Sequence, residues 1–261
     1  MEKSCNICKT TMIPVFTGKI LEKYTVQYFA CPDCGYICTE NPFWLNEAYK
    51  NPINITDTGI LGRNIFLSKI TACVLFIFFN KKIKCLDYGG GYGILTRLMR
   101  DIGFDYYWYD PFARNLFAQG FEYKRNSKKI DVITSFENFE HFSNPVENID
   151  KIFSISKNIL FTTELLPEPV PKPEQWWYYG LEHGQHVSFY SRGTLQTIAK
   201  KYGIYYYSFG NFHFFTPKKI NKLFWLVVCK FSINFIFPII CLKMKSKTVT
   251  DMIYLVETMK R

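Results

Sequence analysis

Residues 86–93 read LDYGGGYG, a glycine-rich stretch between two segments of contrasting pattern. The apolar run IKCLDY (83–88) predicts a buried strand, and ILTRLMRDIG (94–103) predicts a helix that stops at Gly103. Strand, glycine turn and helix in this order place backbone N–H groups at a helix N-terminus, where a ligand can approach closely. The stretch therefore predicts an α/β domain that binds a cofactor beyond the end of a strand.

The spacing within the stretch distinguishes between cofactors. Its acid and glycines follow the pattern DxGxGxG, with Asp87, Gly89, Gly91 and Gly93. A dinucleotide fingerprint would read GxGxxG, but position 94 is an isoleucine, and an acid at the strand end suits a cationic ligand better than a pyrophosphate. The pattern resembles class I S-adenosylmethionine (SAM)-dependent methyltransferases. This resemblance implies that the loop wraps the amino-acid end of SAM.

The segments that follow this loop extend the resemblance. FDYYWYDP (104–111) predicts a strand ending at Asp110, an acid that the family uses to hold the ribose hydroxyls of SAM. Strands and a helix alternate through 129–166, which predicts a parallel sheet, and 202–217 predicts a closing hairpin. Over residues 82–216 the resemblance implies an α/β fold with a Rossmann-like seven-stranded methyltransferase sheet. Another doubly wound nucleotide-binding fold is the alternative.

ENFEHF (137–142) follows the next predicted strand. In the resembling family the residues after this strand line the cofactor, which assigns Glu137 to cofactor binding. Glu140 and His141 lie further along the loop and are candidates for a catalytic role. A structural or substrate-facing role is the alternative for both.

WWYYGLEHGQHVSFYS (176–191) has neither a strand period nor a helix period. Its second half resembles the His-Glu-His-x-Ser-Tyr-Phe-Ser motif of zinc-containing deoxysugar C-methyltransferases. The resemblance places His186 at the second histidine of that motif, which is thought to act as a base. Gln185 stands where the relatives carry glutamate, and their long C-terminal domain does not follow here. Carbon and oxygen both remain candidate acceptor atoms.

A base in this loop is chemically reasonable, because methyl transfer is an in-line displacement in which the acceptor is aligned and loses a proton. A histidine titrates near neutrality, so His186 is the first candidate and His183 the second, with a structural role as the alternative for each. We expect no metal on these two histidines, since the loop offers no third ligand. The candidates for a substrate-binding wall, with core packing as the alternative for the aromatic residues, are Trp177, Tyr178, Gln185 and Tyr190.

Two cysteine pairs near the N-terminus form CxxC–x22–CxxC, with Cys5, Cys8, Cys31 and Cys34. This spacing lets four thiolates converge on one tetrahedral ion, and the segments between the pairs read as two short strands. The order predicts a zinc ribbon with a structural Zn²⁺, whereas a redox CxxC would not explain two pairs. Because the other cysteines are scattered and no signal peptide is evident, we expect a reducing, cytoplasmic location.

Residues 223–242 form an apolar stretch between the basic segments KKINK and KMKSK. The stretch is long enough to span a bilayer, but it contains Lys230, Asn234 and Pro238. We therefore predict a helical hairpin, broken near Pro238, that makes peripheral contact with the anionic inner membrane surface. The predicted division of the chain is a zinc ribbon in 1–45, a methyltransferase domain in 46–216 and a helical extension in 217–261.

Together these features predict SAM-dependent methyl transfer to a small polar acceptor, either a nucleotide-linked sugar or a glycan precursor. The net charge of +10 keeps an RNA methyltransferase as the first alternative, although the lysines are scattered rather than clustered as in most nucleic-acid-binding surfaces. The second alternative is a catalytically weak protein that uses the SAM fold to bind a partner. The sequence indicates no oligomeric state.

Overall fold

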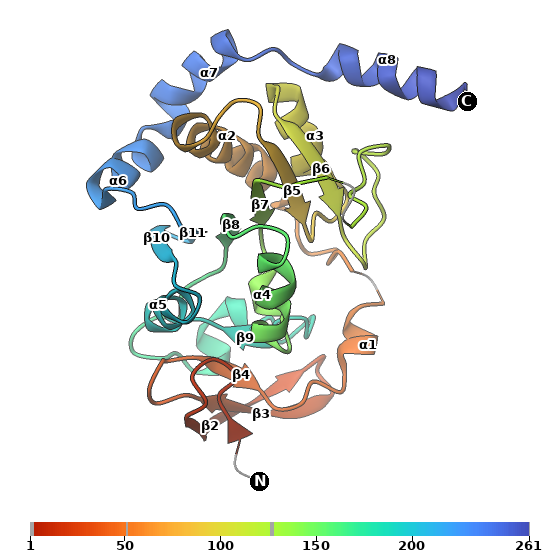
Figure 1. Cartoon of the computed structure of the whole chain (residues 1–261). Helices are drawn as coiled ribbons and strands as arrows, with labels where there is room; N and C mark the ends of the chain where they lie inside the picture. Colours follow the sequence, from red (N-terminus) through yellow and green to blue (C-terminus); the bar gives the residue numbers. More distant parts are fainter. Residues whose placement is uncertain (1–2, 51, 126–127, 261) are drawn as a thin grey trace. The chain divides into compact units, whose positions relative to one another are not determined.

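The computed structural model describes residues 3–50, 52–125 and 128–260 (Figure 1). The chain forms two compact units. Unit 1 combines Met1–Asn54, Phe136–Lys157 and Phe161–Lys218, and unit 2 combines Ile55–Ser135, Asn158–Leu160 and Lys219–Arg261. Each unit is assembled from segments that are far apart in the sequence, whereas the predicted division follows the chain.

A five-stranded antiparallel sheet lies in unit 1. Its strands, in spatial order, are β1 (Lys3–Ser4), β2 (Thr11–Ile20), β3 (Tyr24–Ala30), β4 (Ile37–Thr39) and β9 (Ser188–Phe189). The strands predicted between the cysteine pairs are present as β2 and β3, joined by a turn in which Leu21 and Glu22 adopt the left-handed conformation. The fifth strand is not predicted by the sequence, because β9 comes from residues 180–191, here called the histidine loop, and pairs with β4.

An aromatic core stabilises this sheet. The buried cluster includes Ile20, Val26, Tyr28, Ile37, Trp44, Tyr178, Tyr179, Val187 and Phe189. The ring of Tyr179 lies 5.6 Å from that of Tyr28 and 5.0 Å from that of Phe189, in edge-to-face arrangements that add to the apolar burial. Part of the aromatic run that precedes the histidine loop therefore packs against the five-stranded sheet.

A second, mixed sheet has six strands among the described residues. In spatial order they are β10 (Tyr205–Phe209), β11 (Phe212–Thr216), β8 (Ile159–Thr162), β7 (Val132–Ser135), β5 (Lys84–Tyr88) and β6 (Asp105–Tyr109). β5 pairs in parallel with β6 and β7, and β10 and β11 form an antiparallel hairpin. The predicted combination of parallel strands with a closing hairpin is confirmed.

The sequence-based expectation of seven strands is corrected to six. After β6 the described chain pairs with this strand again through a single parallel bridge, between Trp108 and Glu122. Two backbone hydrogen bonds hold this bridge, from the N–H of Trp108 to the carbonyl of Phe121 (2.9 Å) and from the N–H of Tyr123 to the carbonyl of Trp108 (2.7 Å). One aligned residue pair is too short to count as a strand.

The helices lie between these strands and at the C-terminus. They are α1 (Leu45–Ala48), α2 (Ile60–Phe78), α3 (Ile94–Ile102), α4 (Pro145–Phe153), α5 (Arg192–Lys201), α6 (Lys222–Lys230), α7 (Phe237–Lys243) and α8 (Thr248–Met259), with the short helices η1 (Phe139–His141), η2 (Pro173–Gln175), η3 (Trp177–Tyr179) and η4 (Ser232–Ile236). Gly93 and Gly103 flank α3 in the left-handed conformation. The predicted helix and its glycine stop are therefore confirmed.

The apolar C-terminal stretch is bent instead of folding back as a hairpin. α6 and the helical segment Ser232–Lys243 meet at an angle of 65°. The predicted break near Pro238 is wrong, because Pro238 lies in the first turn of α7, where a missing N–H costs no helical hydrogen bond. α2, and the bent pair if it is counted as one span, are long and apolar enough to cross a membrane, although core helices of soluble proteins share both properties.

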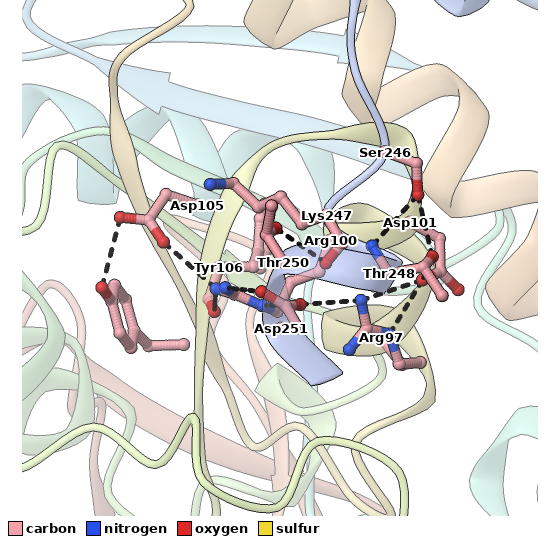
Figure 2. A network of polar contacts seen from close by, with 11 residues as sticks. Arg97, Arg100, Asp101, Asp105, Tyr106, Ser246, Lys247, Thr248, Thr250 and Asp251 are labelled. Atoms are coloured by element: carbon pink, nitrogen blue, oxygen red, sulfur yellow. Dashed lines mark hydrogen bonds and ion pairs between the residues drawn. The ribbon is translucent and has the colours of Figure 1, made fainter. Parts of the chain in front are cut away.

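A buried ion pair fastens α8 to α3 (Figure 2). The guanidinium of Arg100 donates to both carboxylate oxygens of Asp251, from Nε at 2.8 Å and from Nη2 at 2.6 Å. Arg97 donates to the same carboxylate at 2.9 Å, and the N–H of Lys247 donates to the carbonyl of Arg100 at 3.1 Å. Arg100 and Asp251 are each only 4% exposed, and Asp105 also pairs with Arg100 at 3.1 Å, so the two buried charges are compensated within a small network of which their bidentate contact is the centre.

We expect Asp251→Asn to lower the free energy of unfolding by about 3 kcal/mol, because it replaces the bidentate carboxylate beside the buried Arg100 guanidinium with a neutral amide and leaves the single contact to Asp105 at 3.1 Å. Urea denaturation followed by fluorescence measures this change. Asp101→Asn is the matched control: its carboxyl is exposed and also pairs with Arg97, so it should cost less than about 1 kcal/mol. Equal losses in the two variants would show that the buried pair does not anchor α8.

Candidate functional site

The glycine loop of unit 2 forms a tight turn between β5 and α3. Gly89, Gly91 and Gly93 have φ values of +73°, +52° and +84°, a region that other residues seldom adopt. A side chain at Gly93 would also lie 2.7 Å from the Oδ1 of Asn115. The loop backbone is partly exposed at 89–92, so a ligand can reach its polar groups.

Asp87 holds this loop in place through the hydrogen bonds of its side chain. Its side chain is buried, with Oδ2 accepting from the hydroxyl of Thr96 (3.2 Å) and Oδ1 from that of Thr134 (3.1 Å). Burial raises the pKa of Asp87 to about 7, and the charge of Asp110 acts in the same direction, while the two hydroxyls act against it. The carboxyl thus ties the loop to β7 and to the first turn of α3.

Asp110 follows β6 and is bonded to the other side of the loop. Its Oδ2 accepts from the N–H of Gly91 (2.9 Å), and its Oδ1 accepts from the N–H groups of Phe112 (2.8 Å) and Ala113 (2.9 Å). A carboxylate has about four acceptor positions, so these bonds leave about one for a ribose hydroxyl. The loop and its two acids therefore fit a ligand with a cationic group and a ribose.

Glu137 lies immediately after β7 and belongs to unit 1, whereas Asp87 and Asp110 belong to unit 2. Its φ of +49° is left-handed, which is uncommon for a residue with a side chain. The Oε1 of Glu137 accepts from the hydroxyl of Thr162 at 2.6 Å, and the N–H of Glu137 donates to the same hydroxyl oxygen at 2.9 Å. Strained backbone of this kind is found preferentially at functional sites.

The structure brings three of the four predicted catalytic candidates together in unit 1. A carboxylate oxygen of Glu140 and one ring nitrogen each of His141 and His186 all lie within 4.8 Å of one another. His183 lies outside this group: its ring is 4.7 Å from that of His186, but its Nδ1 accepts from the backbone N–H of Gln185 at 3.1 Å. Glu140 and His141 are in η1, and His186 stands just ahead of β9.

Burial dominates the electrostatics of this group. It lowers the pKa of His141 to about 4 and holds the pKa of His186 well below its usual range, where the neighbouring histidines add to the effect. Burial and the charge of Glu137 raise the pKa of Glu140 well above its usual range. The two imidazoles are therefore neutral near pH 7, and their ring nitrogens that lack a proton are available as electron-pair donors.

The four residues predicted to form a substrate wall have different environments. Trp177 is 74% exposed, but the structure places Tyr178, Gln185 and Tyr190 in the interior. The hydroxyl of Tyr190 donates to the carbonyl of Phe139 (2.9 Å), and the side-chain amide of Gln185 donates to the carbonyl of Ala48 (2.9 Å). Trp177 is the member of this set whose ring is open to a ligand.

The four N-terminal cysteines also meet. The sulfurs of Cys5 and Cys34 are 3.7 Å apart and those of Cys8 and Cys31 are 3.3 Å apart, with all four within 4.8 Å of one another. Zinc–sulfur bonds of about 2.3 Å in a tetrahedron would separate the sulfurs by about 3.8 Å. A hydrogen bond from Cys34 lowers the pKa of Cys5 to about 5, whereas the same contact and burial raise that of Cys34. The geometry therefore fits a Zn²⁺ ion.

The cysteine cluster is connected directly to the histidine loop. β4 pairs with β9 through Ile37 opposite Phe189 and Cys38 opposite Ser188. The hydroxyl of Ser191, which caps α5, donates to the carbonyl of Cys34 at 3.0 Å. The sequence alone did not reveal this connection, since a two-residue strand produces no detectable period.

Comparison with known proteins identifies one family and several distant structures. A family described as "Methyltransferase domain" matches residues 63–208. No curated protein matches the chain. Similar solved structures include the plantazolicin methyltransferase BpumL in complex with SAH, with 14% identity, coverage of 62% of this chain and 71% of that one, and a TM-score of 0.41. The magnesium protoporphyrin IX methyltransferase ChlM from Synechocystis PCC 6803 with bound SAH has 12% identity, coverage of 66% and 90%, and a TM-score of 0.42.

We expect Asp87→Asn to change how stability depends on pH. An acid whose pKa is raised on folding stabilises the folded state at low pH, and this contribution is lost as the pH rises through the folded value. Wild-type protein should therefore lose stability relative to Asp87→Asn between about pH 4 and about pH 7. The loss should be about 1.4 kcal/mol for each tenfold difference between the acid dissociation constants of the folded and unfolded states. Urea denaturation of both proteins at several pH values measures this loss. If the difference in the free energy of unfolding between wild type and Asp87→Asn does not change with pH, Asp87 ionises normally.

Proposed function

This chain belongs to the family of methyltransferase domains, and on that premise we propose that it methylates a small polar acceptor, either a nucleotide-linked sugar or another glycan precursor. The activity is SAM-dependent methyl transfer, and SAM supplies an electrophilic methyl group when bound. The glycine loop and Asp110 are the residues that would hold SAM. Asp87 keeps the loop in place, and its carboxyl carries a negative charge above about pH 7.

The observation that carries the acceptor proposal is the attachment of the histidine loop to the cysteine ribbon. The resemblance to zinc-containing deoxysugar methyltransferases rests on a ribbon and a loop that are more than 140 residues apart in this sequence, and the pairing of β4 with β9 makes them one structure. The exposed indole of Trp177, eight residues before Gln185, offers a flat apolar surface of the kind that packs on sugar rings. A ribbon serving only as a remote attachment site would not need to order this loop.

We propose that His186 activates the acceptor as part of a group with Glu140 and His141. The Nδ1 of His186 donates to the carbonyl of Tyr178 at 2.7 Å, which leaves Nε2 with its electron pair. A lone general base works best with a pKa near the working pH, and burial has moved the pKa of His186 well away from that range. This favours a shared role over the single base suggested by the sequence.

We also propose that the cysteine cluster holds a structural Zn²⁺. Four sulfur ligands would complete a tetrahedral ion and leave no position for a substrate. The carbonyl of Cys34 accepts from both Ser191 and Thr194 at the start of α5, so the ion would stabilise the segment that follows the histidine loop. Its contribution to activity would then be indirect.

A methyl-labelling experiment tests the acceptor class. The zinc-loaded full chain is incubated with methyl-deuterated SAM, a pool of nucleotide sugars and total RNA, and both pools are examined by mass spectrometry. We expect label on a sugar nucleotide, with turnover at least about 100-fold lower in His186→Ala and SAM binding unchanged. Glu182→Ala, an exposed neighbour in the same loop, is the control.

Each other result would change the assignment. Label on RNA, together with RNA affinity that falls steeply with salt, would replace the sugar acceptor by RNA and would give the net charge of +10 a role. SAM binding without label in either pool would favour a binding protein built on the methyltransferase fold. Normal turnover in His186→Ala would remove this histidine from the mechanism.

We further propose that the bent helices α6 and α7 make peripheral contact with an anionic membrane surface, at the cytoplasmic face of the inner membrane. Several apolar side chains of α6, η4 and α7 are exposed, including Leu223, Phe235 and Leu242, the last at 89%. Lysines flank these helices at 218, 219, 222, 243, 245 and 247. Exposed apolar groups bordered by basic residues match the apolar interior and negative surface of such a membrane.

We expect the full chain to sediment with phosphatidylcholine vesicles that contain phosphatidylglycerol and to bind less in high salt, because salt screens the lysines. A double substitution, Leu223→Asp with Leu242→Asp, should abolish this binding. Ile55→Asp, which alters an exposed apolar residue outside these helices, should leave it intact. Equal binding to vesicles of phosphatidylcholine alone would contradict the electrostatic part of the proposal, and no binding to either would contradict the whole.

A further inference from the structure

Unit 1 contains a second set of potential metal ligands that shares no residue with the cysteine cluster. It consists of Glu140, His141 and His186, whose ligand atoms lie within 4.8 Å of one another. We infer that these three residues form a binding site for a divalent transition-metal ion, with one carboxylate and two imidazole ligands. Three observations support this assignment: a buried carboxyl group, the orientation of the two imidazoles and the rigidity of the backbone that carries them.

The carboxyl group of Glu140 has an unusual environment. Its side chain is 0% exposed, and neither of its carboxylate oxygens has a hydrogen-bond partner among the residues that the structure describes. The hydroxyls of Tyr178 and Thr163 lie near it and act to lower its pKa, against the larger effect of burial, and they bond to each other at 3.2 Å. Burying a carboxylate without a partner is costly, and a coordinated cation offsets that cost.

The two imidazoles are oriented as metal ligands usually are. The Nδ1 of His141 lies 3.1 Å from the carbonyl oxygen of Gln185, and the Nδ1 of His186 lies 2.7 Å from that of Tyr178. A carbonyl oxygen can only accept, so in each neutral imidazole Nδ1 carries the proton and Nε2 keeps an electron pair, and the backbone of Glu137 also lies against the ring of His141. Histidine ligands commonly donate their second nitrogen to a carbonyl in this way, which fixes the ring and its tautomer.

The backbone holds the ligands in place from both sides. The N–H of Val187 donates to the carbonyl of Glu140 at 2.9 Å. The hydroxyl of Ser188 donates to the carbonyl of Phe142 at 2.5 Å, and that of Tyr190 donates to the carbonyl of Phe139 at 2.9 Å. These bonds join η1 to the loop before and within β9, so little conformational freedom would be lost when an ion binds.

The ligand set indicates the kind of ion. Imidazole and carboxylate ligands suit Zn²⁺, Mn²⁺ and Fe²⁺, and two histidines with one glutamate are a known set for zinc with an open coordination position. His141 and His186 keep some exposed surface, so a further oxygen ligand can reach the site. The sequence led us to expect no metal on the pair His183 and His186, and the site inferred here differs from that pair because η1 supplies Glu140 and His141 and His183 takes no part.

Metal binding at this site does not depend on the proposed acceptor. Zinc content is measured on the purified full chain after zinc loading and removal of unbound metal, with circular dichroism as the test of folding. We expect two zinc ions per chain in wild-type protein, one in His141→Ala, His186→Ala and Glu140→Gln, and one in Cys8→Ser. The matched control is His183→Ala, a histidine of the same loop, which should retain both ions.

A chelator titration of the wild-type protein tests the inference even if the variants fail to fold. We expect two release steps, the first from the open nitrogen and oxygen site and the second from the four thiolates. A single step of one zinc per chain, or retention of both ions in all three variants of Glu140, His141 and His186, would overturn the inference. If the protein labels a sugar nucleotide but holds a single zinc ion per chain, the inferred metal site is wrong and the proposed function stands.

Discussion

The pairing of β4 with β9 is the interaction on which the candidate site depends. It aligns Ile37 with Phe189 and Cys38 with Ser188, so a loop that would otherwise be irregular becomes the edge of the ribbon sheet. Val187, the residue before β9, donates its N–H to the carbonyl of Glu140 and thereby orders η1 as well. The position of His186 is thus fixed by a module whose sequence is more than 140 residues away.

Buried acids in this chain are compensated in different ways, and the difference separates structural from functional roles. Asp251 has the bidentate guanidinium of Arg100, and Asp87 has two hydroxyl donors. Both carboxyls therefore have partners within the protein that explain their burial. Glu140 has none for either oxygen among the described residues, and it is also the acid that lies beside two imidazoles with free electron pairs. Such an incomplete site is what a ligand would complete.

The sequence was most informative where structure is determined locally. Glycine positions defined the loop before α3 and the stop at Gly103, because left-handed backbone restricts the residue type. Cysteine spacing predicted the cluster of four cysteines, because two residues between a pair of thiols allow both to face one point. Features set by distant contacts could not be predicted: the short strand β9, the reduction of a seventh strand to one bridge at Glu122, and the meeting of His186 with η1. Aromatic residues at a binding surface and in a core look alike in sequence, so the burial of Tyr178 and Tyr190 was not evident.

A structural ion in the ribbon and a second ion beside the histidine loop would have different chemistry but a common framework. Four thiolates close the coordination sphere of the first ion, whereas one carboxylate and two imidazoles leave that of the second open. The carbonyl of Cys34 contacts the cap of α5, and β9 lies between that cap and His186. Removing the first ion should therefore lower the affinity of the second site while leaving its three ligands able to hold an ion. This coupling would give a physical reason for the cysteine cluster to accompany the histidine loop. An ion held by four thiolates would keep the carboxylate and imidazole ligands of the second ion in position.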